Sequence, residues 1–371
     1  MKTKILVLCI TLLGLLGYFS LAKSQDETKA TGKSQNSILF NGWYGRIKEK
    51  WQGPLHNTVV FTWYTGLTSA ENEQAYRKLV NNQRKNGVKF IGYYYSATTS
   101  YPSTNVGRFN RFPEGAIPPE AIKYSWILRD TNGQLVTWPG RKNRWFIDIG
   151  KSEVQDAILT RAIKNAKRLG ANVLNLDNWN YKSFAPAGQT KEQWAEKNLA
   201  LLIRARELTH QHNLKLVVNQ ASPFEHWHKF APYLDGFAFE QSTHSIWLTK
   251  RNLYEMELNT YEQMMAMGKS LFLFTYIYSE TRKAWDPDGR KVATTALLVM
   301  PQDNPHWGGI YVSLSGSEVW PVGGWTMWPE QLGKPLGPRK WDGNTITRKF
   351  EHGSISVTVG EKPKFNIHFE Y

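Results

Sequence analysis

The sequence predicts a (β/α)8 TIM barrel followed by a small C-terminal antiparallel β segment. Short apolar runs rich in β-branched or aromatic residues recur eight times between residues 58 and 314, and helical stretches separate most of them. Strands that alternate with helices predict a parallel sheet, because each return crossing needs a helix. Eight such units fit a closed barrel better than an open sheet. No Gly-rich phosphate loop follows the first run, which argues against a dinucleotide-binding fold.

The eight predicted strands share an apolar run that is bounded by polar residues. They span 58–64, 88–95, 144–149, 172–177, 215–219, 236–240, 271–278 and 309–314.

Helix boundaries between these strands are marked by capping signals. A capping box pairs a Ser or Thr with a Glu or Gln three residues later. It is predicted for Thr68 with Glu71, Ser152 with Gln155, and Thr190 with Gln193. Glycines that can end a helix stand at 87, 170 and 268. The helix after Ser152 has an apolar face made of Val154, Ile158, Ala162, Ala166 and Leu169.

The N-terminus reads as an export signal over residues 1–24. Lys2 and Lys4 give a positive start, and an apolar run from Ile5 to about Leu21 ends in small and polar residues. The expected localisation is therefore secreted or periplasmic. An uncleaved N-terminal membrane anchor is the alternative, since the run is near the lower length limit for a span.

The rest of the chain divides into a lead-in, a barrel and a tail. We expect a flexible lead-in over residues 25–37, the barrel over 38–330 and the C-terminal β segment over 331–371. An insertion at 96–143 separates the second and third predicted strands, and within it 126–138 predicts a hairpin around Asn132-Gly133. Long loops after barrel strands gather at the C-terminal face, so the insertion is expected to form one wall of a substrate cleft.

Composition excludes some chemistry and leaves the partner open. The only cysteine, Cys9, lies inside the export signal, so the mature chain has no thiol nucleophile and no disulfide. The net charge is +15, but the basic residues are scattered, which favours a generally basic surface over a dedicated polyanion site. No nucleic-acid partner is expected.

Three predicted strands end in an acid, namely Asp148, Asp177 and Glu240, and a fourth ends in Asn219. Polar residues at the C-terminal ends of barrel strands are typical of catalytic sites. Strand alternation supports this placement: if Asp177 and Asn175 point inward, Leu174 and Leu176 face the helices. The same holds for Glu240, Ala238 and Gly236 against Phe237 and Phe239. The alternative is that an acid caps a helix or pairs with an arginine.

Paired carboxylates in an aromatic-lined cleft are the equipment of glycoside hydrolysis. One donates a proton to the leaving oxygen, while the other attacks the anomeric carbon or activates a water. Asp177 and Glu240 are the predicted catalytic pair, and the partner is a polysaccharide or oligosaccharide. Predicted sugar contacts are Trp63, Tyr95, Trp179, Tyr276 and Tyr278, with core packing as the alternative for each.

The motifs around these acids resemble a known family. Trp145-Phe-Ile-Asp148, Asn172-Val-Leu-Asn-Leu-Asp177-Asn178, Val217-Val-Asn219 and Asp235-Gly-Phe-Ala-Phe-Glu240 look like the hypothetical glycosyl hydrolase barrels related to the endo-α-1,4-polygalactosaminidases. The resemblance covers roughly residues 55 to 360. It implies that Asp177 is the nucleophile or base and Glu240 the general acid, with these roles exchangeable. It also implies that Asp148 binds substrate, and Asn178 and Asn219 are expected beside it. A basic protein would repel the cationic polymer that polygalactosaminidases cleave, so the substrate is expected to be neutral or acidic.

Two other functions fit the sequence. One is a non-catalytic carbohydrate-binding protein on a glycosidase barrel, and the other is a polyanion-binding surface protein. No cofactor or metal is expected, because His226, His228 and His244 give only weak zinc spacing.

Overall fold

The computed structural model describes most of the chain between residues 90 and 370. The described residues are 39–40, 59–62, 74, 77–78, 80–81, 84–85, 90–100, 121–179, 185–219, 226–240, 247–276, 294–300, 310–315 and 332–370. The predicted export signal and lead-in therefore lie outside the described residues, as do Thr68, Glu71 and Gly87. None of the helices in the described ranges is both long and apolar enough to cross a membrane.

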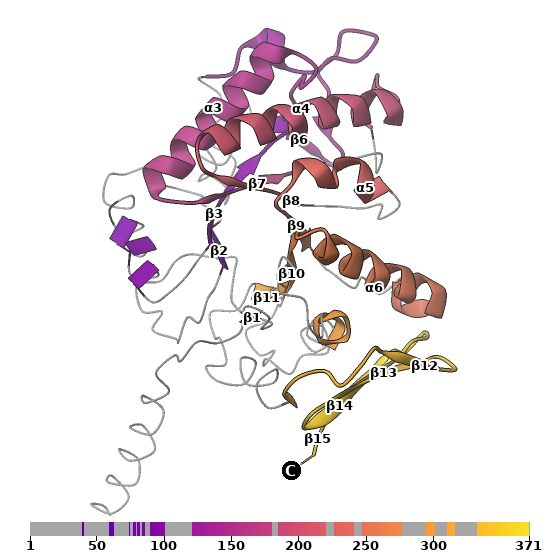
Figure 1. The fold of residues 1–371 in the computed structure, drawn as a ribbon. Helices are drawn as coiled ribbons and strands as arrows, with labels where there is room; N and C mark the ends of the chain where they lie inside the picture. Colours follow the sequence, from indigo (N-terminus) through magenta and orange to yellow (C-terminus); the bar gives the residue numbers. More distant parts are fainter. Residues whose placement is uncertain are drawn as a thin grey trace, which may run out of the picture.

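An eight-stranded parallel sheet forms the centre of the molecule (Figure 1). Its strands in chain order are β1 (Leu39–Phe40), β2 (Val59–Thr62), β3 (Phe90–Ser96), β7 (Val173–Asp177), β8 (Lys215–Asn219), β9 (Gly236–Glu240), β10 (Ser270–Tyr276) and β11 (Ile310–Ser315). Their spatial order is β1-β11-β10-β9-β8-β7-β3-β2. No pairing joins β1 to β2 among the described residues, so these strands are the two ends of the sheet.

The predicted third strand is wrong. Residues 141–146 form β6 (Arg141–Phe146), which lies outside the parallel sheet in a separate antiparallel sheet with β4 (Thr99–Ser100) and β5 (Thr137–Trp138). β3 pairs directly with β7, and β1 supplies the eighth strand. The physical reason is local: β6 pairs back onto the segment that follows β3, so its apolar side chains are buried by the insertion and by Trp194, whose ring meets Phe146 edge-on at 5.8 Å.

The predicted hairpin of the insertion is confirmed. Arg129 and Leu135 form an antiparallel bridge, and the amide of Asp130 donates to the Gln134 carbonyl at 2.9 Å. Gly133 has φ +72°, a left-handed backbone that glycine adopts without strain.

Residues 294–299 are helical, and among the described residues four α-helices and three short 3-10 helices with defined bounds also accompany the sheet. They are α3 (Ser152–Leu169), α4 (Lys191–Gln211), α5 (Trp227–Phe230) and α6 (Arg251–Ala266), with 3-10 turns at Tyr124–Trp126, Ala231–Tyr233 and Trp247–Thr249. Figure 1 shows α3 and α4 side by side next to β3, β7 and β8. The predicted apolar face of α3 is confirmed, since each of its five members is fully buried.

Three of the predicted helix signals are confirmed and one is wrong. Gly170 ends α3 with φ +79°, and Gly268 follows the C-cap of α6 with φ +72°. Thr190 forms a capping box with Gln193 at the start of α4. The capping box predicted at Ser152 does not form, because Lys151 is the N-cap and makes no side-chain cap. Gln155 instead donates to the carbonyl of Ile149 at 2.7 Å, which takes it away from the role of capping partner.

The two faces of the parallel sheet differ sharply. Leu174 and Leu176 of β7 join the apolar core that packs against the helices, as do Phe237 and Phe239 of β9. Phe237 contacts Phe230 of α5, and Phe239 contacts Tyr261 of α6. The alternate positions of these strands therefore belong to the opposite, inner face of the sheet, as the sequence predicts. At Gly236 a Cβ would stand 2.6 Å from the Ser270 carbonyl oxygen, so β10 approaches β9 closely there.

The predicted C-terminal antiparallel segment is confirmed as a four-stranded sheet. It contains β12 (Lys340–Asp342), β13 (Thr345–Phe350), β14 (Gly353–Thr358) and β15 (Lys364–Phe369). Figure 1 shows this sheet beside α6. Arg339, just before β12, forms ion pairs with Glu255 and Glu262 of α6. Buried Arg348 donates to the carbonyls of Leu297 and Leu298, and burial lowers the pKa of its guanidinium to about 10.

Thr190→Ala and Ser152→Ala together test the contrast between the capping box that forms at α4 and the predicted one that does not form at α3. Thr190→Ala removes the acceptor of the Gln193 amide, which is bonded at 3.1 Å, and is expected to lower the free energy of unfolding by about 1 kcal/mol. Ser152→Ala removes no cap and is expected to change it by less than about 0.5 kcal/mol. Urea denaturation midpoints measure both. Equal losses in the two variants would contradict the observed caps.

Candidate functional site

The candidate site is built around Asp177, the last residue of β7. Its side chain lies on the inner face of the sheet and the residue is 8% exposed. Oδ2 accepts hydrogen bonds from the Tyr94 hydroxyl and from Asn178 Nδ2 at 2.8 Å, and Oδ1 accepts one from Asn219 Nδ2 at 2.8 Å. The donors come from β3, from the residue after β7 and from the end of β8. The carboxylate therefore joins three neighbouring strands at their C-terminal edge.

The donors to Asp177 among the described residues are all uncharged. In the part of the chain that the structure describes, no lysine, arginine or histidine forms an ion pair with it. The described hydrogen bonds all donate to the carboxyl oxygens, an arrangement that suits a nucleophile or general base. Among the described residues no cation neutralises this carboxyl group, so it is placed to stabilise a positive charge that develops next to it in a buried environment.

Asn178 fixes the turn that follows β7. Its φ is +58°, a left-handed conformation that Asn tolerates better than most residues. The Thr98 hydroxyl donates to the Asn178 carbonyl at 2.7 Å, and the Ala97 amide donates to the Asp177 carbonyl at 2.9 Å. Both bonds come from the segment just after β3, so the turn is held from the neighbouring strand and the Asn178 amide group is directed at the carboxylate.

The structure brings together three of the residues predicted from sequence, namely Asp177, Asn178 and Asn219. Tyr94 is a fourth member that the sequence analysis missed. It pairs with Asn175 in the β3–β7 register, and Ser96 pairs with Asp177, so Tyr94 and Ser96 share the inner face with the carboxylate. Strand alternation applied to β3 would have found it, had the phase of Tyr93-Tyr94-Tyr95 been known.

Glu240 ends β9, two strands away from Asp177. Asn219 of β8 pairs with Ala238, so Glu240 lies two residues further along its strand than the level of Asn219. The structure describes Glu240 and Tyr276 by their backbones, as members of β9 and β10. Trp63 and Tyr278 fall outside the described residues.

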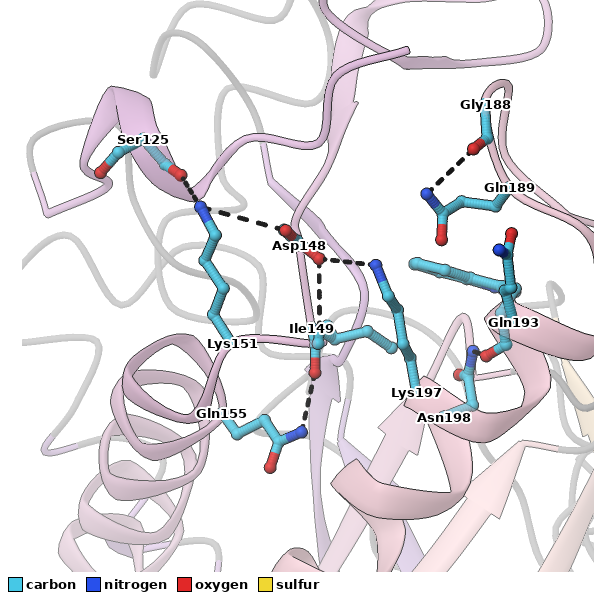
Figure 2. A network of polar contacts seen from close by, with 12 residues as sticks. Ser125, Asp148, Ile149, Lys151, Gln155, Gly188, Gln189, Gln193, Lys197 and Asn198 are labelled. Atoms are coloured by element: carbon cyan, nitrogen blue, oxygen red, sulfur yellow. Dashed lines mark hydrogen bonds and ion pairs between the residues drawn. The ribbon is translucent and has the colours of Figure 1, made fainter. Parts of the chain in front are cut away.

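Asp148 does not join the site. It follows β6 outside the parallel sheet, and its Oδ1 pairs with Lys197 of α4 at 3.0 Å. Figure 2 shows Asp148 between Lys197 and Lys151, whose Nζ also donates to the Ser125 carbonyl. The predicted role in substrate binding finds no support in these contacts, because both oxygens of Asp148 face lysines. The acid follows a strand of the insertion rather than a strand of the sheet that carries Asp177.

The prediction that Tyr95 and Trp179 contact sugar is wrong. Both are fully buried and belong to the core between sheet and helices. Trp179 donates to the Asn198 carbonyl of α4 at 3.0 Å and meets Phe230 edge-on at 4.8 Å. Tyr95 stands one residue away from the inner-face Tyr94 and so faces the helices. Neither ring has a face open to a ligand.

Comparison with known proteins gives structural similarity only. No protein-family model and no curated protein sequence matches the chain. Aspergillus fumigatus Ega3 in complex with galactosamine is similar over 77% of this chain and 96% of its own, at 14% identity and a TM-score of 0.46. The glycoside hydrolase domain of PelA from Pseudomonas aeruginosa matches 75% of this chain and 94% of its own, at 14% identity and a TM-score of 0.44. The noncanonic maltogenic alpha-amylase AmyB from Thermotoga neapolitana matches 91% of this chain and 99% of its own, at 11% identity and a TM-score of 0.48.

The neighbouring tyrosines of β3 give a test of the site's geometry. Tyr94→Phe removes a donor to the buried Asp177 carboxylate and is expected to lower the free energy of unfolding by about 1.5–3 kcal/mol. Tyr95→Phe removes a buried hydroxyl that has no hydrogen-bond partner among the described residues, so it is expected to be neutral or stabilising. Chemical denaturation at neutral pH measures both. Similar losses in the two variants would contradict the assigned faces.

The same pair predicts a pH dependence. Burial raises the pKa of the Tyr95 phenol far above its usual value, so the folded protein resists its ionisation. The stability that depends on a neutral Tyr95 is fully present below the pKa of about 10 that tyrosine has in the unfolded chain. It is lost progressively as the pH rises above that value. Wild type is expected to lose stability more steeply than Tyr95→Phe above about pH 10. Parallel stability curves for the two proteins would contradict this.

Proposed function

We propose that the chain is a glycoside hydrolase in which Asp177 and Glu240 are the two working carboxylates. The observation that carries the proposal is the environment of Asp177. It is a buried carboxylate at the C-terminal edge of a parallel sheet, held by uncharged donors and left without a counter-ion among the described residues. Such a group suits attack at an anomeric carbon, activation of a water, or stabilisation of an oxocarbenium-like transition state.

In this proposal the parallel sheet closes into a barrel, with β1 beside β2. The eight parallel strands in continuous order support it, because closure of that order needs only one further pairing. The C-terminal ends of all strands then surround one mouth, where barrel enzymes bind their substrates. Trp63, Tyr276 and Tyr278, at or just past predicted strand ends, remain the candidates for sugar contact.

Glu240 is assigned to the same mouth from its place on β9. Phe237 and Phe239 pack against the helices, so alternation gives position 240 to the inner-face set of Gly236 and Ala238. Two strands at a spacing of about 4.8 Å, together with the offset of two residues along β9, separate the backbones of positions 177 and 240 by about 12 Å. Two carboxylates that lean toward one another across such a span reach the separations of about 5–9.5 Å that glycosidases use.

The roles follow from the surroundings of Asp177. Its carboxylate is already an acceptor of hydrogen bonds, which assigns it the nucleophile or base role, and Glu240 then protonates the leaving oxygen. The net charge of +15 favours a neutral or acidic glycan over a cationic one. We further propose that the enzyme acts outside the cytoplasm after export directed by residues 1–24.

Hydrolysis of a glycan panel by matched variants tests the function. Asp177→Asn and Glu240→Gln keep shape and remove charge, and each is expected to lower kcat/KM for the cleaved glycan by about 10²–10⁴-fold. Asp156→Asn, an exposed acid of α3 paired with Arg204, is the matched control and is expected to retain activity. Full activity in both site variants would refute the proposal. Glycan binding without any product from wild type would identify a carbohydrate-binding protein instead.

A further inference from the structure

A chain of buried polar side chains leads from the Asp177 site into the insertion. Asn178 Nδ2, which donates to Asp177, also donates to Ser96 Oγ at 3.1 Å. Ser96 Oγ lies 2.7 Å from Thr99 Oγ1, and Arg144 Nε donates to Thr99 Oγ1 at 3.0 Å. Ser96, Thr99 and Arg144 are each less than 8% exposed. The chain thus connects the end of β3 and the small sheet of β4 and β6 to the carboxylate.

The hydrogen of Ser96 sets the direction of the bond that reaches Asn178. Arg144 Nε–H donates to Thr99 Oγ1, and the hydroxyls of Thr99 and Ser96 lie 2.7 Å apart, where either can donate. The Ser96 hydroxyl also lies 3.4 Å from the Thr99 carbonyl, to which it donates. Because a serine has one hydroxyl hydrogen and both arrangements direct it at Thr99, the Ser96 oxygen accepts from Asn178 Nδ2.

This polarity decides which end of the Asn178 amide meets Asp177. With Nδ2 between Ser96 and the carboxylate, its two hydrogens bond both oxygens. The opposite orientation would place the amide oxygen against a carboxylate oxygen and a serine lone pair, which is repulsive. Arg144 itself is held in place, because its guanidinium carbon lies 4.1 Å from the ring centroid of Trp138.

We propose that Arg144, Thr99 and Ser96 are positioning residues that hold the Asn178 amide, and through it the Asp177 carboxylate, in the geometry needed for catalysis. The proposal rests on the hydrolase function proposed above. It assigns the segment after β3 a task besides the cleft wall that the sequence predicts: the small sheet of β4 and β6 anchors the hydrogen bonding of the catalytic carboxylate. These side chains act through Asn178 and need not touch the substrate.

We call the connected side chains of Arg144, Thr99, Ser96 and Asn178 the relay. Kinetics of single and double variants test it. Thr99→Val removes the hydroxyl without changing volume, and Ser96→Ala and Arg144→Met remove the other links. Each is expected to lower kcat by about 10–100-fold, the cost of a misplaced catalytic group, with KM changed less than about twofold. Thr99→Ser keeps the hydroxyl and is expected to restore most of kcat. Combining Arg144→Met with Thr99→Val should cost no more than either alone, because one broken link already releases the chain.

Thr137→Val is the matched control, since Thr137 lies on β5 of the same small sheet and no hydrogen bond of its hydroxyl to the relay is present. It is expected to leave kcat unchanged. Unaltered kcat in Thr99→Val and Ser96→Ala, with Asp177→Asn inactive, would overturn the relay while leaving the hydrolase function intact. So would a loss in Thr137→Val equal to that in Thr99→Val.

A second measurement does not depend on activity. Denaturation midpoints of Thr99→Val, Asp177→Asn and the double variant are expected to be non-additive if the two residues are coupled through Ser96 and Asn178. If wild type cleaves no glycan, the hydrolase function fails and this cycle alone decides the relay. Additive midpoints would then overturn it.

Discussion

The hydrogen bonds that Asp177 accepts depend on the register of three parallel strands. Tyr94 reaches it from β3, where it pairs with Asn175, and Asn219 reaches it from β8, directly after the residue that pairs with Leu176. A slip of one residue in either pairing would send the donor to the helix face and leave a buried carboxylate with too few partners. The polar site and the register of the sheet therefore constrain each other.

The helix layer imposes the same register from the other side. Leu174 and Leu176 of β7 bury their side chains among the helices, and Phe237 and Phe239 of β9 do so against α5 and α6. These contacts supply apolar burial at every second position, so the residues between them are left for the inner face. The inner face of β7 and β8 can then carry Asn175, Asp177 and Asn219 because packing against the helices does not depend on them.

Much of this arrangement can be predicted from sequence where alternation has a clear phase. In β7 the leucines alternate with the polar residues Asn175 and Asp177, so the sequence shows which residues share each face of the strand. Phe90-Ile-Gly-Tyr-Tyr-Tyr-Ser96 has no such contrast, and three consecutive tyrosines allow either phase. The sequence therefore predicts Tyr95 as a site residue, whereas the structure places Tyr94 beside Asp177. The prediction that 144–149 is a strand of the parallel sheet is wrong for a related reason. A short apolar run has the same sequence pattern in a parallel strand and in a strand that pairs back on its neighbour.

Asp148 and Asp177 show why an acid at the end of an apolar run is an incomplete signal. Asp148 satisfies the rule, but its run belongs to the small antiparallel sheet of β4, β5 and β6, and Lys197 and Lys151 pair with its partly buried side chain. A carboxylate paired with two cations has little charge left for catalysis. Asp177 follows a strand of the main sheet and is surrounded by uncharged donors that orient it without cancelling its charge. Lys151 stands only three residues after Asp148, whereas Lys197 comes from α4. The shorter contact, 3.0 Å to Lys197, is therefore a tertiary contact that the motif around Asp148 does not contain.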